Sequence, residues 1–265
     1  MDPRNLPTSS SGLKRLRGVI FDYGNTLVRL DPSVRSARTD YADVVARPGA
    51  ESLGVFLERA GAIPERRQAA FVERFLEVRE RNRKQAEEHG QEIVALQSLR
   101  ETLLDLTLPV PAEADLEAAL TEFFRAEVEL IRPMPGAGEL LEALRDRGLK
   151  LAMLSNATCG RTIADVVGRM GWAGHFDPLV VSADIGVRKP RPEAFRAVLD
   201  RWTLNPEEVA MVGDSLYHDV GGARALGLMT IHFAAIPNAF DGAVADSVRP
   251  GFTVASHEEL RRLLL

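Results

Sequence analysis

Short apolar runs that alternate with amphipathic helical segments constrain the fold of this chain more than any other feature of its sequence. Each run is mostly aliphatic and has the length of a single buried strand. The runs are Arg17–Phe21, Lys150–Leu154, Pro178–Ser182, Val209–Val212 and Thr230–Phe233. Strands that alternate with helices are typical of βαβ units. The pattern therefore predicts an α/β fold whose parallel sheet is covered by helices on both faces.

The segments around the last four runs have helical spacing and recognisable helix ends. The predicted helices are Gly138–Arg147, Thr162–Met170, Pro192–Trp202, Val220–Leu226 and His257–Leu265. Gly148 and Gly227 follow two of these helices. Glycine commonly ends a helix because it adopts the left-handed conformation without a steric penalty. These ends support the alternating pattern.

The block that follows the first run is helical throughout. Its apolar residues recur at helical spacing, for example at Phe71, Phe75 and Val78, and Arg and Glu residues lie between them. Breaks are predicted at Pro48-Gly49, Gly61–Pro64, His89-Gly90 and Pro109–Pro111. Because this block interrupts the alternating series, we predict an inserted, mostly helical domain. The predicted division is a flexible N-terminus at 1–16, a core at 17–30 and 131–265, and the helical domain at 31–130.

Composition excludes several classes of function. Lys and Arg number 33 against 38 Asp and Glu, which gives a net charge of −5 over 265 residues. A mildly acidic chain has no broad attraction for nucleic acid or anionic lipid. No apolar run approaches the roughly 18 residues of a membrane span, and Met1–Arg17 lacks the apolar core of a signal peptide. The single cysteine, Cys159, excludes an intrachain disulfide. We therefore expect a cytoplasmic protein that binds neither nucleic acid nor membrane, and the sequence leaves its oligomeric state open.

Polar residues follow the predicted strands at the points where the strands end. Asp22 follows the first run, Ser155-Asn156 follows the second, and Lys189 comes a little beyond the third. Asp214 and Asp219 follow the fourth. Ligands of open parallel sheets bind beyond the carboxyl ends of the strands. We therefore expect these side chains to converge at one edge of the sheet.

Such a set of groups is suited to phosphoryl transfer. Asp22 and Asp214 are candidate ligands of Mg²⁺, which prefers carboxylate oxygens. The cation and Lys189 would neutralise the phosphoryl oxygens while Asp22 attacks phosphorus. The Ser155 hydroxyl would hold a remaining oxygen.

Four segments carry a resemblance to a known family: Asp22-Tyr-Gly-Asn-Thr26, Ser155-Asn156, Gly186-Val-Arg-Lys-Pro190 and Gly213-Asp-Ser-Leu-Tyr-His-Asp219. In this order and spacing they resemble the motifs of the haloacid dehalogenase superfamily of aspartate-nucleophile hydrolases, over about Gly18 to Phe252. The resemblance implies a Rossmann-like core with an inserted helical cap. It also implies that Asp22 is the nucleophile and forms an aspartyl-phosphate, and that Lys189 pairs with Asp22 and the phosphate.

The resemblance implies further site residues. Ser155 would bind the phosphoryl group, and Thr26 and Asn156 are further candidates for substrate binding. Asp214 would ligate Mg²⁺ together with Asp22. Asp219 would be another ligand or would support the ligands from behind, and the Gly24 carbonyl would also face the metal.

One position departs from the family pattern. Most phosphatases of the family carry a second aspartate two residues after the nucleophile, where this chain has Gly24. That aspartate protonates the leaving alcohol and later activates water, and such acid–base help commonly contributes about 10²–10⁴-fold. Either another side chain or water substitutes, the substrate has an easy leaving group, or the protein is a weak catalyst. Tyr41, Glu58 and His89 are conceivable donors.

The leading hypothesis is a Mg²⁺-dependent phosphatase that acts on a small phosphorylated metabolite. A metal-independent 2-haloacid dehalogenase is the first alternative, although that branch has a tyrosine where this chain has Gly24. Gly213-Asp214-Ser215 favours the phosphatase, because a second carboxylate is useful only with a cation. The other alternative is a regulatory or binding protein that keeps the fold without efficient turnover.

Two groups of arginines remain. Arg35, Arg38 and Arg47 follow the first motif and are candidates for contact with an anionic substrate. The run Arg79–Lys84 is interleaved with glutamates, which predicts a solvated helix face.

Overall fold

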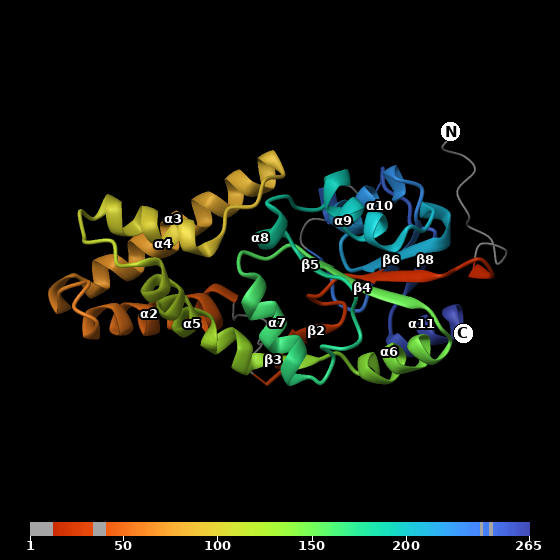
Figure 1. The fold of residues 1–265 in the computed structure, drawn as a ribbon, viewed down its shortest axis with the longest axis horizontal. Coiled ribbons are helices and arrows are strands. Elements are labelled where there is room, and N and C mark those ends of the chain that lie inside the picture. Colours follow the sequence, from red (N-terminus) through yellow and green to blue (C-terminus); the bar gives the residue numbers. More distant parts are fainter. Residues whose placement is uncertain (1–12, 34–40, 239–240, 244–245) are drawn as a thin grey trace. The chain divides into compact units, whose positions relative to one another are not determined.

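The computed structural model describes residues 13–33, 41–238, 241–243 and 246–265, which form two compact units (Figure 1). The first, here called the α/β unit, consists of the described residues up to Arg29 together with Pro133–Asn156 and Val167–Leu265. The second, the helical unit, consists of the described residues of Leu30–Arg132 and Ala157–Val166. The segment Ala157–Val166 lies within the range predicted for the core. Most of the predicted N-terminal segment 1–16, as well as Arg35 and Arg38, lies outside the described residues.

A six-stranded parallel sheet forms the centre of the α/β unit, as the alternating pattern predicts. Its strand order is β5-β4-β1-β6-β7-β8. The strands are β1 (Gly18–Phe21), β4 (Lys150–Ser155), β5 (Leu179–Val181), β6 (Val209–Gly213), β7 (Met229–Phe233) and β8 (Phe252–Val254). β1 is paired with β4 on one side and β6 on the other, with Gly18 opposite both Lys150 and Val209. All residues of β1 and β6 are buried, which is typical of central strands in a parallel sheet.

Helices cover both faces of this sheet. α9 and α10 lie on one face, whereas α6 and α11 lie together on the other (Figure 1). The helices of this part of the chain are α6 (Ala137–Asp146), α7 (Gly160–Arg169), α8 (Ser182–Ile185), α9 (Pro192–Trp202), α10 (Gly222–Ala225) and α11 (His257–Leu264). The Trp202 ring packs directly on the backbone of β1, because a Cβ at Gly18 would lie only 2.5 Å from it. This close packing holds β1 against α9.

Two further details of the structure differ from the sequence prediction. The helix predicted at Val220–Leu226 begins earlier, as the π-helix η4 (Leu216–Gly221), and continues into α10. β8, and a separate two-stranded sheet of β2 (Val28–Leu30) and β3 (Ile131–Pro133), were not predicted. Each of these strands has three residues of which only one is buried, so no apolar run marks it in the sequence.

In the described part of the helical unit, four consecutive α-helices surround an aromatic and aliphatic core. They are α2 (Arg47–Arg59), α3 (Gln68–His89), α4 (Ala95–Asp105) and α5 (Glu113–Leu130), with the π-helix η1 (Ala42–Ala46) before them. Phe71 and Phe75 of α3 stack at a centroid distance of 5.9 Å, and Phe123 of α5 meets Phe75 edge-on at 5.2 Å. Pro48 lies in the first turn of α2 and does not break it, since that turn needs no donor from this position.

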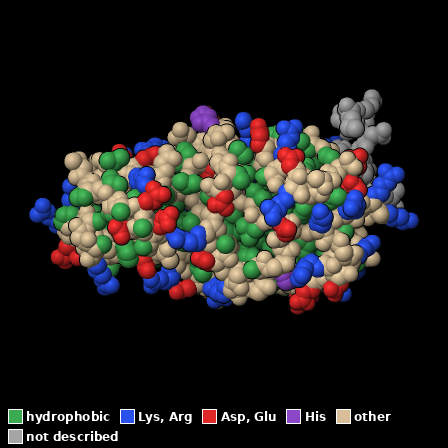
Figure 2. All heavy atoms as spheres, in the orientation of Figure 1, with side chains coloured by type: hydrophobic (Ala, Val, Ile, Leu, Met, Phe, Trp, Pro, Cys, Tyr) green, Lys and Arg blue, Asp and Glu red, His purple; other side chains and the backbone are tan. Residues whose placement is uncertain are grey.

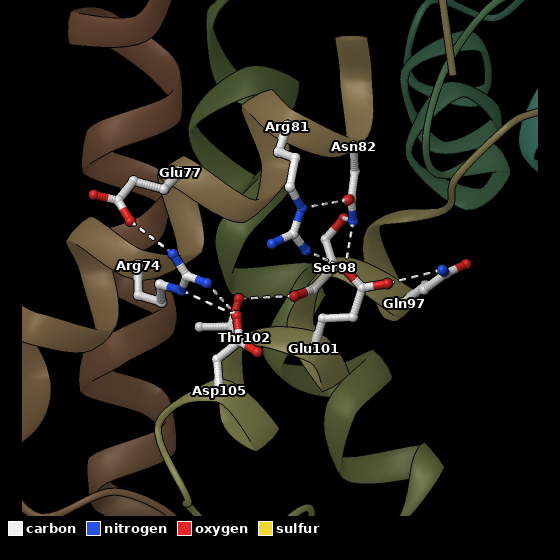
Figure 3. Close-up of polar contacts among 9 residues, drawn as sticks. All are labelled: Arg74, Glu77, Arg81, Asn82, Gln97, Ser98, Glu101, Thr102 and Asp105. Carbon is white, nitrogen blue, oxygen red and sulfur yellow. Dashed lines mark hydrogen bonds and ion pairs between the residues drawn. The ribbon is translucent and has the colours of Figure 1, made fainter. Parts of the chain in front are cut away.

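Polar contacts join α3 and α4 on the surface of the helical unit (Figure 3). Arg74 holds Asp105 at 2.5 Å and Arg81 holds Glu101 at 2.7 Å. Asn82, which is buried, donates to the Ser98 hydroxyl at 3.1 Å and to Glu101 at 2.9 Å. We call the exposed ion pairs between α3 and α4, Arg74–Asp105 and Arg81–Glu101, the surface ladder.

The surface agrees with the composition. Lys and Arg side chains are interspersed with Asp and Glu over most of the face in Figure 2. None of the helices in the described part of the chain combines the length and the apolarity that crossing a bilayer requires.

Candidate active site

The carboxyl ends of three adjacent strands carry the central residues of the site. β4, β1 and β6 are neighbours in the sheet and run in the same direction. Ser155 is the last residue of β4, Asp22 follows β1, and Asp214 follows β6. All three side chains are buried. The topology therefore brings these residues to one edge of the sheet, as expected for the ligand-binding edge of an α/β fold.

Lys189 links the first and last of the predicted motifs. Its Nζ donates to Asp22 Oδ1 at 2.6 Å and to Asp219 Oδ1 at 2.7 Å. The Lys189 and Asp219 side chains are 2% and 1% exposed, and the Asp22 side chain is 12% exposed. A buried ammonium between two carboxylates makes strong, charge-assisted bonds that fix all three side chains. We call Asp22, Lys189, Asp214 and Asp219 the site cluster.

Charge and burial shift the pKa values of this cluster. Burial raises the pKa of the Asp22 carboxyl above its usual range, despite the opposing charge of Lys189. For Lys189, burial favours the neutral amine. The charges of Asp219 and Asp22 outweigh this effect and raise its pKa, so the ammonium stays charged. Burial and the charges of Asp22 and Asp219 together raise the pKa of Asp214 to about 7.

Two asparagines hold Asp214 by a single oxygen. Asp214 Oδ2 accepts hydrogen bonds from Asn25 at 3.1 Å and from Asn238 at 2.9 Å. These bonds orient the carboxylate. Sequence reasoning missed both residues. Asn25 lies inside the first motif with a positive φ of 53°, a conformation that asparagine tolerates. Asn238 follows β7, so the rule that directed attention to strand ends also applies to it.

The segment from Gly213 to Asp219, which connects the end of β6 to η4, is folded tightly onto itself. The Ser215 backbone N–H donates to Asp219 Oδ2 at 3.1 Å, and the Ser215 hydroxyl accepts from the His218 N–H at 3.1 Å. A Cβ at Gly213 would lie only 2.2 Å from Asp219 Oδ2, so only glycine leaves room for this carboxylate. With Lys189 on Oδ1 and Ser215 on Oδ2, both oxygens of Asp219 contact the chain itself. Asp219 is therefore well placed to position its neighbours.

A second pair of contacts anchors the loop from outside. Asp241 accepts from the Leu216 N–H at 2.6 Å, and its other oxygen lies 3.2 Å from His232 Nε2. The same His232 nitrogen lies 3.1 Å from the Asp214 carbonyl oxygen. His232 is thus a residue with satisfied polar contacts on β7.

The carboxylates of the site cluster fit a divalent cation. Asp22, Asp214 and Asp219 each provide an oxygen, and these oxygens lie within 4.8 Å of one another. Carboxylate oxygens are the ligands that Mg²⁺ prefers. Three buried carboxyl groups face one ammonium, and a bound cation would balance the remaining negative charge. The donor set is therefore suited to Mg²⁺.

The remaining predicted site residues, Asn156, Thr26 and Gly24, have different surroundings in the structure. Asn156 accepts from the Lys189 N–H at 2.8 Å and donates to the Lys189 carbonyl at 2.9 Å, so it positions Lys189. Its direct contact with substrate stays a prediction. Thr26 is fully buried, and its hydroxyl has no hydrogen-bond partner among the described residues, so its contact with substrate also stays a prediction. Gly24 has open space around it, with no atom within 4 Å of a Cβ placed there.

The conceivable proton donors lie in the helical unit. The Tyr41 hydroxyl donates to Glu127 at 2.7 Å, Glu58 is partly buried on α2, and His89 is exposed at the end of α3. The role of each as an acid stays a prediction.

Comparison with known proteins decides the family. Residues 16–227 match the haloacid dehalogenase-like hydrolase family. The chain belongs to this family. Within it, the chain is 38% identical over 112 residues to the phosphoserine phosphatase of Thermus thermophilus, a match covering 42% of this chain and 45% of that protein. The chain matches about half the length of its first curated relatives.

Solved structures of this family share the fold. The haloacid dehalogenase-family phosphatase of Thermococcus onnurineus superposes with a TM-score of 0.58 at 19% identity, covering 94% of this chain and 98% of that one. The 2-haloacid dehalogenase of Pseudomonas syringae pv. tomato gives 0.63 at 24% identity, with the same two coverages. Because both enzyme types superpose equally fully, the likeness establishes the fold and leaves the reaction to the site residues.

Proposed function

We propose that this hydrolase is a Mg²⁺-dependent phosphatase that removes phosphate from a small phosphorylated metabolite through an aspartyl-phosphate on Asp22. The observation that carries the proposal is the buried site cluster, in which Lys189 holds Asp22 and Asp219 while Asp214 lies beside them. The relative named as a phosphoserine phosphatase agrees with this reading.

The residues of the cluster have separate parts in the proposed reaction. The Asp22 carboxylate attacks phosphorus, the bond to the leaving oxygen breaks, and the phosphoryl group is carried on Asp22 until water releases it. Lys189 neutralises negative charge on the phosphoryl oxygens while keeping Asp22 in place. The Ser155 hydroxyl, at the end of β4, holds another of those oxygens. A bound Mg²⁺ would supply further charge stabilisation to the same oxygens.

Asp214 has the geometry of a cation ligand. Asn25 and Asn238 both bind its Oδ2, which orients the carboxylate while Oδ1 accepts no hydrogen bond from either of them. Burial raises its pKa to about 7, and repulsion from Asp22 and Asp219 adds to this effect. A cation would relieve that repulsion, and this need favours the phosphatase over a metal-independent dehalogenase.

Gly24 sets the expected substrate preference. No carboxyl group stands at position 24 to protonate the leaving oxygen, so the leaving group has to depart with little help from this loop. Aryl phosphates, whose leaving oxygen is already weakly basic, should react faster than alkyl phosphates.

Hydrolysis of p-nitrophenyl phosphate with and without Mg²⁺ tests the proposal. We expect turnover with Mg²⁺, loss of turnover with a chelator, and a fall of at least about 10³-fold in Asp22→Asn. Asp146→Asn, which changes an exposed aspartate at the end of α6, is the matched control and should retain full activity.

Three outcomes would count against the proposal. Wild-type activity in Asp22→Asn would remove the nucleophile assignment. Chloride release from 2-chloropropionate in the presence of chelator would favour the dehalogenase instead. Binding of Mg²⁺ without turnover of any phosphate ester would favour a regulatory or binding protein.

A further inference from the structure

The edge of the sheet at which β1 and β4 begin carries a cavity of about 330 Å³. Its lining residues lie between 13 and 17, between 147 and 150 and at 264, so the whole cavity belongs to the α/β unit. Asp22 and Ser155 lie at the opposite edge, where the same two strands end. A ligand in this cavity is therefore separated from the site cluster by the length of the strands.

Four cationic side chains line the cavity, namely Lys14, Arg17, Arg147 and Lys150. None of its lining residues, all of which belong to the described part of the chain, is Asp or Glu. This concentration of charge is unusual for a chain whose net charge is −5. Lysine occurs at only four positions of the sequence, 14, 84, 150 and 189. Half of the lysines therefore lie at one cavity.

Two of the four cations bond to neutral carbonyl oxygens. Lys150 Nζ donates to the Trp202 carbonyl at 3.4 Å, and the Arg147 guanidinium donates to the Leu264 carbonyl. These carbonyls lie at the ends of α9 and α11, where each helix dipole places about half a negative charge. Ammonium and guanidinium groups carry three and five N–H donors, and both side chains are exposed. Donors for a ligand therefore remain on both.

The chain leaves a positive charge at the cavity. Arg17 pairs with Glu208 at 3.3 Å, which cancels one of the four charges. Within the residues that the structure describes, Lys14, Arg147 and Lys150 make no ion pair. Since the two helix ends together offset about one more charge, about two positive charges remain to attract an anion.

The rest of the cavity wall is mostly apolar. Four of the other five lining residues are leucines, among them Leu16 and Leu264. An inorganic anion gains nothing from such a wall, whereas an organic molecule buries its apolar part against it. The volume lies near the lower end of the range of about 300–1,000 Å³ that small-molecule sites occupy. The cavity therefore suits an organic anion of moderate size.

We propose that this cavity binds an organic phosphate of about nucleotide size that carries at least two negative charges. The guanidinium forks of Arg17 and Arg147 match phosphate oxygens, and the ammonium groups of Lys14 and Lys150 add charge without a fixed direction. The leucines accommodate the apolar part of the molecule. The proposal does not depend on the reaction at Asp22, and adenosine diphosphate (ADP) is the ligand used to test it.

Lysine labelling with pyridoxal 5′-phosphate locates the site. Its aldehyde condenses with a lysine amine, water is lost, and borohydride reduces the imine to a stable amine. The reaction is run on Asp22→Asn with a chelator, so that no phosphate is hydrolysed. We expect Lys14 and Lys150 to be modified at least about 5-fold faster than Lys84, because a bound phosphate holds the aldehyde beside them. Lys84, which is 70% exposed on α3, is the internal control. ADP should protect the two cavity lysines saturably and leave the labelling of Lys84 unchanged.

Calorimetric titration with ADP in the presence of chelator measures the affinity. We expect a Kd below about 1 mM for the wild-type protein and an increase of about 10-fold in Arg147→Gln, which loses a charge-assisted contact. Lys150→Gln should raise the Kd similarly and leaves the contact between Arg147 and Leu264 intact. Arg145→Gln changes an exposed arginine of α6 that does not line the cavity, and it should keep the wild-type Kd.

Three results would overturn the proposal. The first is labelling of Lys84 as fast as that of Lys14 and Lys150, or no protection of these two by ADP. The second is a Kd for ADP that Arg147→Gln and Lys150→Gln both leave unchanged, since the nucleotide would then bind elsewhere. The third is equal affinity for pyrophosphate, because the apolar wall would then contribute nothing. Absence of phosphate hydrolysis in the wild type would refute the proposed function and leave these measurements unaffected.

Discussion

Two polar clusters, one in each unit, are built from ion pairs of almost equal length. In the α/β unit, Lys189 lies 2.6 Å from Asp22 and 2.7 Å from Asp219. In the helical unit, Arg81 lies 2.7 Å from Glu101 (Figure 3). The difference is burial, since Lys189 is 2% exposed and Arg81 is 50% exposed.

Ion pairs of the same length contribute differently to stability when they are exposed and when they are buried. An exposed pair is screened by water and typically contributes about 0–1 kcal/mol. A buried pair costs a large desolvation free energy, and removal of one partner leaves an unpaired charge in the interior. The surface ladder of the helical unit is therefore tolerant of change, whereas the site cluster depends on every member. Asn82 is an intermediate case, because it is buried and lies in contact with the exposed ladder.

Lys189→Met should give the largest effect. It leaves Asp22 and Asp219 buried without their cation, and we expect a loss of about 3–5 kcal/mol in the free energy of unfolding. Turnover of p-nitrophenyl phosphate should fall at least about 10²-fold, because the proposed reaction assigns Lys189 the stabilisation of the transition state. Urea unfolding and hydrolysis rates measure the two effects. Arg81→Met is the exposed counterpart and should cost less than about 1 kcal/mol. Equal losses in the two variants would contradict the comparison.

Gly24→Asp should add the carboxyl group that the site cluster lacks. The position has no neighbouring atom within 4 Å of a new Cβ and does not require a positive φ, so the side chain fits. We expect kcat for ethyl phosphate to rise at least about 10-fold, with a smaller gain for p-nitrophenyl phosphate. Gly24→Asn, of the same size without an acid, should show no gain. A similar rise in both variants would show that shape rather than proton transfer is responsible.

Gly213→Ala tests how closely the site cluster is packed. The added methyl would meet the Asp219 carboxylate at 2.2 Å and force it away from Ser215 or Lys189. We expect a loss of about 1–3 kcal/mol in the free energy of unfolding, measured in urea. Gly24→Ala is the control and should change stability by less than about 1 kcal/mol, since nothing crowds that position. A harmless Gly213→Ala would mean that Asp219 tolerates displacement.

Asn82→Ala should have the smallest effect of the four. It removes buried hydrogen bonds to Ser98 and Glu101, which we expect to cost about 1–2 kcal/mol in the free energy of unfolding. Arg74→Met, which breaks only exposed pairs, should cost less, and its effect should fade in 1 M salt. Thermal unfolding at low and high salt compares the two variants. If the loss of stability in Asn82→Ala depended on salt, Asn82 would behave like the exposed ion pairs between α3 and α4, contrary to this prediction.

Local patterns in the sequence were sufficient to predict the α/β unit. Each long buried strand and its following helix carry their own signal, and the predicted helix Pro192–Trp202 coincides with α9. Pro48 was misread because a proline in the first turn of a helix resembles a break. β2, β3 and β8 each bury only one of three residues, so they lack an apolar run, and the pairing of β2 with β3 joins segments far apart in the sequence.

The candidate site was predictable where motifs mark the ends of strands. Asp22 and Asp214 each follow a strand directly and Ser155 is the last residue of one, so topology alone brings them together. Asn238 and Asp241 lie beyond the end of β7, so the strand-end rule applies to that segment, but its sequence carries no motif that singles out these two residues.

Arg79, predicted to lie on a solvated helix face, is partly buried, and its guanidinium carbon lies 4.4 Å from the ring centre of Phe123. The sequence held a signal for this position. Phe71, Phe75 and Arg79 are spaced four residues apart, and residues at this spacing share one face of a helix. That face is the buried one, as Phe71 and Phe75 show. The surrounding glutamates obscured this periodicity, because they belong to other faces of the same helix.

The division of the chain into two units limits how a helical domain can be exchanged between related proteins. The chain passes between the two units at four points, after Arg29, Arg132, Asn156 and Val166. A helical module borrowed from a relative at the first two junctions alone would bring foreign partners for Ala157–Val166. Successful recombination therefore requires that the ten-residue segment Ala157–Val166 be transferred together with the first segment.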